Sequence, residues 1–176
     1  MREVDDNWLP VRAALRQDGL YLALRQVRAD ELRDAFMQET VGRVAAAEKA
    51  VLIATGDIGK AAAGTAPAGL IFHVARCGST LIAQLLKQPG KLVVYGEPLP
   101  VNEILVPPHR HSRDELVCAL RSLADAFARH AGGPFVLKLS SWNTLYCDIV
   151  AEAFPETPGI LSLRDPVEVG VSLLRE

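Results

Sequence analysis

The chain has 176 residues, of which 49% are hydrophobic and 23% charged, as is ordinary for a globular protein with one sizeable core. The formal net charge of −2 gives no reason to expect a nucleic-acid partner or a basic membrane patch. No apolar run approaches the ~18 residues that cross a bilayer, and the first ten residues are too acidic for a signal peptide. We therefore expect a cytoplasmic protein without nucleic-acid or membrane partners, and the oligomeric state stays open.

The cysteines and histidines indicate neither a disulfide framework nor a metal site. Cys77, Cys118 and Cys147 are odd in number, far apart and without a CxxC pair, which disfavours both zinc and disulfides. His109 and His111 stand in a proline-flanked stretch with no carboxylate or thiol at ligand spacing. The expected metal content is therefore none.

The first 68 residues predict a helical N-terminal segment. Residues 11–27 read as helix-like, with an interruption at Asp18 and Gly19, and Asp30 is a plausible cap for a following helix. Residues that recur at helical spacing in that second helix are Leu32, Phe36, Val41 and Val44. Residues 51–55 predict a short strand, and residues 56–69, rich in Gly, Ala and Pro, predict a loop.

From Gly69 onward, apolar runs alternate with amphipathic stretches. We expect strands over residues 70–74, 91–95, 135–139 and 159–163, and helices over residues 80–87, 113–130, 144–154 and 166–175. The prolines between Pro98 and His111 are expected to break regular structure. Solid apolar strands alternating with helices predict an α/β fold of three layers, with a parallel sheet covered on both faces. Residues 1–176 then form one domain, in which residues 69–176 are the α/β core.

The turn between the first of these strands and its helix has the composition of a phosphate site. A helix N-terminus presents unpaired N–H groups and a partial positive charge. Gly78 allows close approach of the backbone, Ser79 and Thr80 add hydroxyl donors, and Arg76 adds a charged fork. The turn departs from the Walker A pattern, because His73 replaces its first glycine and Ser79 replaces its lysine. The plain alternative is a capped turn without a ligand.

A second polar group follows the last predicted strand. Asp165 is a suitable N-cap and Pro166 suits the first helical position. Arg164 then stands at the carboxyl end of a strand, where ligands bind in parallel sheets. Ser172 follows Arg164 by eight residues, about two helical turns. A surface charge and a solvated hydroxyl are the plain alternative for this pair.

Together, the segments ARCGSTLIAQLL and RDPVEVGVS resemble the two donor-binding motifs of the sulfotransferases, bacterial type. The resemblance runs from about Gly69 to the end of the chain and corresponds to the N-terminal part of the family domain, since family members continue further. It implies a P-loop NTPase-like fold and the donor 3′-phosphoadenosine 5′-phosphosulfate, without a metal. Carried over to this chain, the 5′-phosphosulfate would be held by Arg76, Cys77, Gly78, Ser79 and Thr80, and the 3′-phosphate by Arg164 and Ser172. Cys77 departs from the serine common at its position.

The same resemblance gives roles to two further residues. Glu97, after an apolar run, matches a Glu-Pro of several bacterial sulfotransferases in which Glu is the general base, and a carboxylate suits that task. Lys138, in an apolar run, matches a Lys-x-His in which Ser140 here replaces the His. Lys138 could therefore assist the transferring group, or snorkel to the sheet edge. The catalytic residues expected are Glu97, Arg76 and Lys138.

The reaction implied is transfer of a sulfuryl group from that donor to a hydroxyl or amine of a small-molecule or glycan acceptor. Two alternatives stay open. One is another P-loop enzyme such as a small-molecule kinase, which the missing lysine disfavours. The other is a truncated, non-catalytic relative that binds a nucleotide without turnover.

Overall fold

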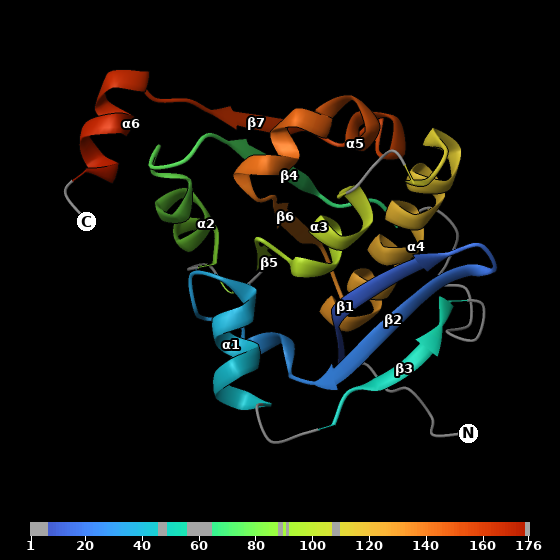
Figure 1. The fold of residues 1–176 in the computed structure, drawn as a ribbon. Coiled ribbons are helices and arrows are strands. Elements are labelled where there is room, and N and C mark those ends of the chain that lie inside the picture. The colour runs from blue at the N-terminus through green and yellow to red at the C-terminus, as the bar shows by residue number, and fades with distance from the viewer. Residues whose placement is uncertain are drawn as a thin grey trace.

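The computed structural model describes residues 7–45, 49–55, 65–87, 90, 92–106 and 110–174. The part from residue 69 onward is an α/β unit built on a four-stranded parallel sheet of order β5-β6-β4-β7 (Figure 1). Its strands are β4 (Gly69–His73), β5 (Val93–Gly96), β6 (Phe135–Lys138) and β7 (Gly159–Ser162). The parallel sheet and its four strands confirm the prediction, with boundaries that differ from the predicted ones by at most two residues.

Helices lie on both faces of this sheet. Successive strand residues point to opposite faces, so each face has apolar side chains that helices cover. On one face, α2 (Ser79–Lys87) packs its Ala83 against Ile71 of β4, Val94 of β5 and Val136 of β6. The other face is covered by the following helical elements: α3 (Leu99–Leu105), α4 (Arg113–Ala131), the 3₁₀ helix η4 (Ser141–Tyr146) and α5 (Cys147–Ala153). Leu70, Tyr95 and Phe135 face this second layer.

The longest helix, α4, follows the predicted pattern. Ser112 caps it by accepting a hydrogen bond from the Glu115 N–H, and Gly132 ends it with a left-handed φ of 62°. The predicted apolar face is buried, as Leu116, Leu120, Leu123 and Phe127 show. Capping at both ends and an apolar stripe at period 3.6 are sufficient to explain this element.

The N-terminal segment corrects the prediction of helices there. Residues 11–27 form most of an antiparallel hairpin of β1 (Trp8–Arg16) and β2 (Gly19–Gln26), which β3 (Val51–Ala54) extends. Asp18 and Gly19 lie at the hairpin turn, where a glycine with a φ of 138° fits the reversal. Burial alternates along β2 with a period of two, and the buried Leu20, Leu22 and Leu24 belong to the same hydrophobic cluster as α4. The predicted helical N-terminal segment is wrong in this part.

The second N-terminal helix is shorter than expected. Residues 29–31 form a 3₁₀ turn, η1 (Ala29–Glu31), so Asp30 lies within a helix rather than before one. The helix α1 begins later and spans Met37–Val44. The predicted strand at 51–55 is confirmed as β3, while residues 56–64 of the predicted loop lie outside the described residues.

The proline-rich stretch after β5 also corrects the prediction. Residues 99–105 form α3, with Pro98 at its N-cap and Pro100 within its first turn. Proline is tolerated in a first helical turn, because the N–H that it lacks has no partner there. Pro107, Pro108 and His109 lie outside the described residues. The predicted helix over 144–154 is divided into η4 and α5.

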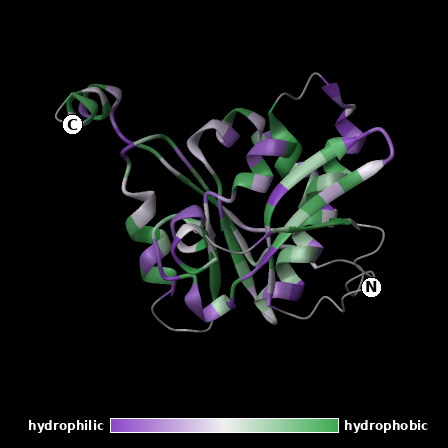
Figure 2. Cartoon of the chain, turned by 60° about the horizontal axis from the view of Figure 1, so that its bottom comes forward, coloured by the Kyte–Doolittle hydropathy of each residue, from purple (hydrophilic) through white to green (hydrophobic). Residues whose placement is uncertain are grey.

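The C-terminal elements are more exposed than a sheet covered on both faces requires. Ile160 and Leu161 of the edge strand β7 are half exposed, and no residue of α6 (Pro166–Leu173) is buried. Figure 2 shows α6, next to the C-terminus, set apart from the rest of the chain. None of the helices in the described ranges is long and apolar enough to cross a membrane.

Candidate functional site

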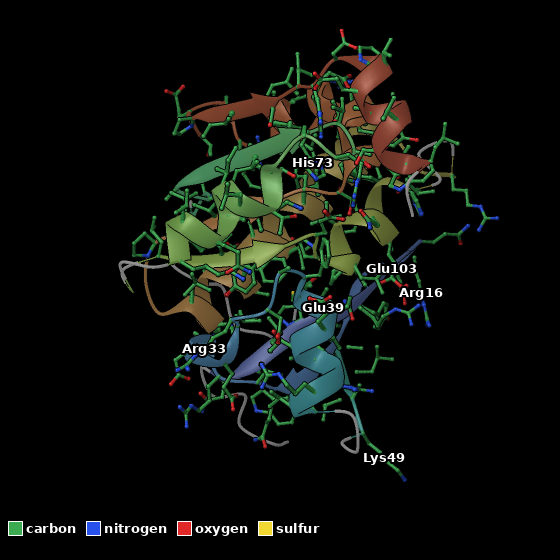
Figure 3. The ribbon with its side chains drawn as sticks, turned by 90° about the vertical axis from the view of Figure 1, so that its left-hand side faces the viewer. Arg16, Arg33, Glu39, Lys49, His73 and Glu103 are labelled. Carbon is green, nitrogen blue, oxygen red and sulfur yellow. The ribbon has the colours of Figure 1, made fainter. Side chains whose placement is uncertain are left out.

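Three ionisable side chains meet at the carboxyl edge of the parallel sheet. Ile71 of β4 and Gly96 of β5 both pair with Lys138 of β6, so β5 and β6 end at the same level and β4 continues for two residues, to His73. Lys138 Nζ donates a hydrogen bond to Glu97 Oε1, and His73 Nε2 lies 3.4 Å from the same oxygen. We call His73, Glu97 and Lys138 the carboxylate cluster. Figure 3 shows the labelled His73 where β4 ends.

The carboxylate cluster is largely withdrawn from solvent. The Lys138 side chain is fully buried, that of His73 is 6% exposed, and that of Glu97 retains 26%. Burial alone would raise the pKa of Glu97, but His73 and Lys138 outweigh it and hold that pKa below its usual value. Glu97 is therefore a carboxylate at neutral pH, and one of its edges is open to solvent.

The backbone around Glu97 is held in an unusual conformation. Glu97 has a φ of 48°, which is uncommon for a residue with a side chain, and its N–H donates to the Lys138 carbonyl over 2.7 Å. A Cβ on Gly96 would lie 2.3 Å from the Ala35 carbonyl oxygen, so only glycine fits there. Such strain is typical of functional positions that their surroundings over-determine.

The segment between η1 and α1 forms a wall of the carboxylate cluster. The Ala35 carbonyl abuts Gly96, and Lys138 Nζ lies 5.2 Å from the centre of the Phe36 ring. Lys87, at the end of α2, donates a hydrogen bond to the Asp34 carbonyl and so joins the segment to α2. The N-terminal part of the chain is therefore joined to the candidate site.

A group of amides and a hydroxyl follows β6. Asn102 Nδ2 donates to the Ser140 hydroxyl over 3.0 Å, and the Ser140 N–H donates to Asn143 Oδ1 over 3.0 Å. The other polar atoms of these amides, Asn102 Oδ1 and Asn143 Nδ2, are buried and have no hydrogen-bond partner among the described residues. Such atoms are rare and costly in folded proteins. One buried acceptor, on Asn102, and one buried donor, on Asn143, are therefore without a partner among the described residues.

The predicted phosphate turn lies between β4 and α2. Arg76 and Gly78 both have positive φ angles, of 60° and 87°, so the turn is sharp. The Gly78 carbonyl accepts hydrogen bonds from Leu81 and Ile82, which leaves the earlier amides of Ser79 and Thr80 as the first N–H groups of the helix. Ser79 is buried, whereas Thr80 is half-buried.

Cys77 lies in this turn and is partly exposed. Its burial would raise the pKa of the thiol, but contacts with Ser162 and Ser79 and the nearby His73 outweigh that effect and lower it. Ser162 of β7 also donates to the Cys77 carbonyl over 3.4 Å. The structure therefore places Cys77 between the turn and β7 rather than in the core.

The structure brings three of the predicted donor-binding residues together. Arg76 Nε donates to the Ser172 hydroxyl over 3.0 Å, and Arg164 Nη1 donates to the Arg76 carbonyl over 3.0 Å. Arg164 also pairs with Glu168 at 2.9 Å. Asp165 caps α6 as predicted, accepting from the Val167 N–H at 2.8 Å. We call Arg76, Arg164 and Ser172 the arginine cluster.

Some members of the site had no counterpart among the sequence-based candidates. The sequence indicates His73 only as a departure from the Walker A pattern. A histidine that ends an apolar strand at the ligand-binding edge of a sheet is nevertheless a usable signal. Asn102 lay in a stretch expected to be irregular. The wall formed by Ala35 and Phe36 depends on long-range packing, and no local pattern indicates it.

The comparisons with known proteins add no relative to this description. Neither a family model, nor a curated protein, nor a solved structure matches the chain. Within the described ranges, no group of three or more His, Cys, Asp or Glu side chains is arranged to hold a metal ion.

Proposed function

We propose that the protein is a sulfotransferase that uses 3′-phosphoadenosine 5′-phosphosulfate as its donor. The observation that carries the proposal is the arginine cluster, in which residues 96 positions apart, Arg76 and Ser172, are hydrogen-bonded beside the start of α2. Two guanidinium groups, a hydroxyl and a helix N-terminus form a surface suited to an anion with more than one phosphate.

Different residues would bind the two ends of the donor. The amides of Ser79 and Thr80, with Gly78 and Cys77 in the turn, would hold the 5′-phosphosulfate, and Arg76 would stabilise the charge on the leaving phosphate. Arg164 and Ser172 would bind the 3′-phosphate. The strand-turn-helix unit of β4 and α2 supports a P-loop NTPase-like assignment of the fold, with the turn lacking the lysine that serves nucleoside triphosphates.

The carboxylate cluster would serve the acceptor. As an acceptor hydroxyl or amine attacks sulfur, its proton passes to Glu97, a new bond to sulfur forms, and the bond between sulfur and the phosphate oxygen breaks. The electron pair of that bond leaves with the adenosine bisphosphate. Lys138 balances the charge of Glu97 before transfer and can assist the sulfuryl oxygens. Arg76, Glu97 and Lys138 are thus the proposed catalytic residues, acting on a small-molecule or glycan acceptor.

The test is calorimetric titration with 3′,5′-adenosine bisphosphate, the donor without its sulfuryl group. We expect saturable binding that Arg164→Ala weakens at least tenfold, since a charged hydrogen bond to phosphate is lost. Arg28→Ala is the matched control, because Arg28 is also an exposed arginine paired with a nearby carboxylate, that of Asp30. It should leave binding unchanged.

Two results would count against the proposed function. Absence of bisphosphate binding together with magnesium-dependent ATP binding would favour a small-molecule kinase. Bisphosphate binding without sulfuryl transfer to any acceptor tried would favour a non-catalytic relative.

A further inference from the structure

His73 faces an oxygen acceptor with each of its ring nitrogens. Nδ1 lies 2.9 Å from the carbonyl oxygen of Val74, and Nε2, which is buried and makes no hydrogen bond among the described residues, lies at an ion-pair distance of 3.4 Å from Glu97 Oε1. A neutral imidazole carries one N–H, whereas a carbonyl oxygen and a carboxylate can only accept. In the neutral form, one nitrogen would therefore turn a lone pair towards an oxygen. Only the doubly protonated imidazolium suits both contacts.

We propose that His73 is a positioning residue that, as an imidazolium, fixes the orientation of the Glu97 carboxylate. Lys138 and His73 both approach Oε1, which leaves Oε2 without a partner among the described residues. A carboxylate held by one oxygen presents the other in a fixed direction. The catalytic part of this inference rests on the proposed function, in which Oε2 is the atom that receives the proton of the acceptor.

The charged and titratable groups around His73 support its protonation. They are Glu97 after β5, Lys138 of β6 and the Cys77 thiol in the turn before α2. Burial opposes the positive charge, as does Lys138, but Glu97 and the Val74 carbonyl outweigh them and raise the pKa of His73 above its ordinary value. With one carboxylate between two cations, the cluster carries a net positive charge beside the proposed anion site.

His130 is a natural control, because it is equally buried but has different partners. Its Nε2 lies 2.6 Å from the Val27 carbonyl, and its Nδ1 lies 2.8 Å from the Tyr95 hydroxyl, which also lies 3.0 Å from the Phe127 carbonyl. Unlike a carboxylate, this hydroxyl can donate its proton to Nδ1. A single N–H then satisfies both contacts. Burial, with no carboxylate nearby to offset it, lowers the pKa of His130. The two buried histidines should therefore differ in charge near neutral pH.

The first experiment is an NMR titration of the imidazole nitrogens in the intact protein. The chain has only four histidines, so His73→Gln and His130→Gln assign the two buried ones. We expect both nitrogens of His73 to be protonated at pH 6.5, where His130 is neutral. Glu97→Gln should lower the pKa of His73 and leave that of His130 unchanged. A neutral His73 at pH 6.5, or one insensitive to Glu97→Gln, would overturn the inference.

The second experiment measures the pH dependence of kcat/KM for sulfuryl transfer. The wild type should lose activity on the alkaline side as His73 loses its proton. His73→Gln keeps a donor that does not titrate, so its alkaline limb should be absent, while His73→Ala should be about tenfold less active across the range. An unchanged alkaline limb in His73→Gln would refute the role. If the protein transfers no sulfuryl group, the proposed function fails, and the NMR titration still decides the state of His73.

Discussion

The two halves of the candidate site are built in opposite ways. The carboxylate cluster is enclosed by the ends of three strands, the start of α3 and the wall of Ala35 and Phe36, and its lysine is fully buried. The arginine cluster lies on the surface, and two of its members, Arg164 and Ser172, come from the link before α6 and from α6 itself, where no residue is buried. The first members of the two clusters along the chain, His73 and Arg76, are three residues apart.

The two halves obtain their geometry from different sources. Packing fixes the carboxylate cluster before any ligand arrives, which is what proton transfer requires. The arginine cluster is held by two hydrogen bonds and an exposed ion pair, and exposed pairs contribute little to stability. A polyanionic ligand would supply the missing interactions. Changes in the first half should therefore affect catalysis and folding, and changes of Arg164 or Ser172 in the second should affect donor binding with little effect on folding.

The largest effect is expected for Glu97→Gln. Glutamine preserves shape and a hydrogen-bond acceptor for Lys138 but cannot take a proton. Sulfuryl transfer should fall by about 10²–10⁴-fold, the usual contribution of a general base. Calorimetric affinity for 3′,5′-adenosine bisphosphate should stay within about threefold of the wild type. Turnover retained at the wild-type rate would remove Glu97 from the mechanism.

Lys138→Met tests the buried ion pair through stability. It leaves the Glu97 carboxylate with His73 alone, and breaking a buried pair on one side costs about 3 kcal/mol or more in the free energy of unfolding. Lys87→Met is the control, since Lys87 is half-buried nearby and donates to a carbonyl rather than to a carboxylate. It should cost about 1 kcal/mol. If urea unfolding shows equal losses of unfolding free energy for the two variants, the Lys138–Glu97 pair stabilises the protein no more than the hydrogen bond of Lys87 does.

Ser172→Ala tests the exposed half with a smaller change. It removes the hydroxyl that accepts from Arg76 and, in the proposed complex, one hydrogen bond to the 3′-phosphate. Affinity for the bisphosphate should drop by about threefold to tenfold, and the free energy of unfolding should change by less than about 0.5 kcal/mol. A stability loss as large as that of Lys138→Met would contradict the division of the site into two halves.

The smallest effect is expected in the pH dependence of stability. Glu97 has a lowered pKa, so its contribution is present above the ordinary value of 4.5 and is lost as the pH falls through the lowered pKa. His73 has a raised pKa, so its contribution is present below 6.5 and is lost as the pH rises through the raised pKa. The difference in unfolding free energy between wild type and Glu97→Gln should therefore be greatest between pH 4.5 and 6.5. A difference that is flat with pH would contradict both shifts.

The α/β core could be predicted from the sequence because its signals are local. Apolar runs of four or five residues marked the parallel strands, and Ser112 and Gly132 marked the ends of α4. The N-terminal hairpin was missed because leucine-rich segments such as residues 20–24 are compatible with both periods. The Asp18–Gly19 pair, treated as a helix interruption, was the hairpin turn.

The sequence predicts individual residues of the candidate site but not which of them are in contact. Arg76, Arg164 and Ser172 were named for one ligand, and the structure brings them together. Glu97 and Lys138 were given separate roles, yet they form one ion pair with His73 beside it. That pairing depends on the strand order β5-β6-β4, which places the ends of three non-consecutive segments together. Strand order is a property of the whole fold, and local patterns do not specify it.

The close approach of Ala35 to Gly96 has a consequence for how the protein folds. These residues are 61 positions apart in the chain, and Lys138, which lies against Phe36, is farther still. Contacts of such separation form only after the long loops between them have closed, and loop closure slows folding. The pairings of β4 with β6 and β7 join residues 67 and 89 positions apart, such as Gly69 with Val136 and Leu70 with Gly159, so the sheet and the wall of the carboxylate cluster both depend on long-range closure. A chain whose N-terminal segment has not docked would have the local turn between β4 and α2, whereas Gly96 and Lys138 would lack the wall that Ala35 and Phe36 provide.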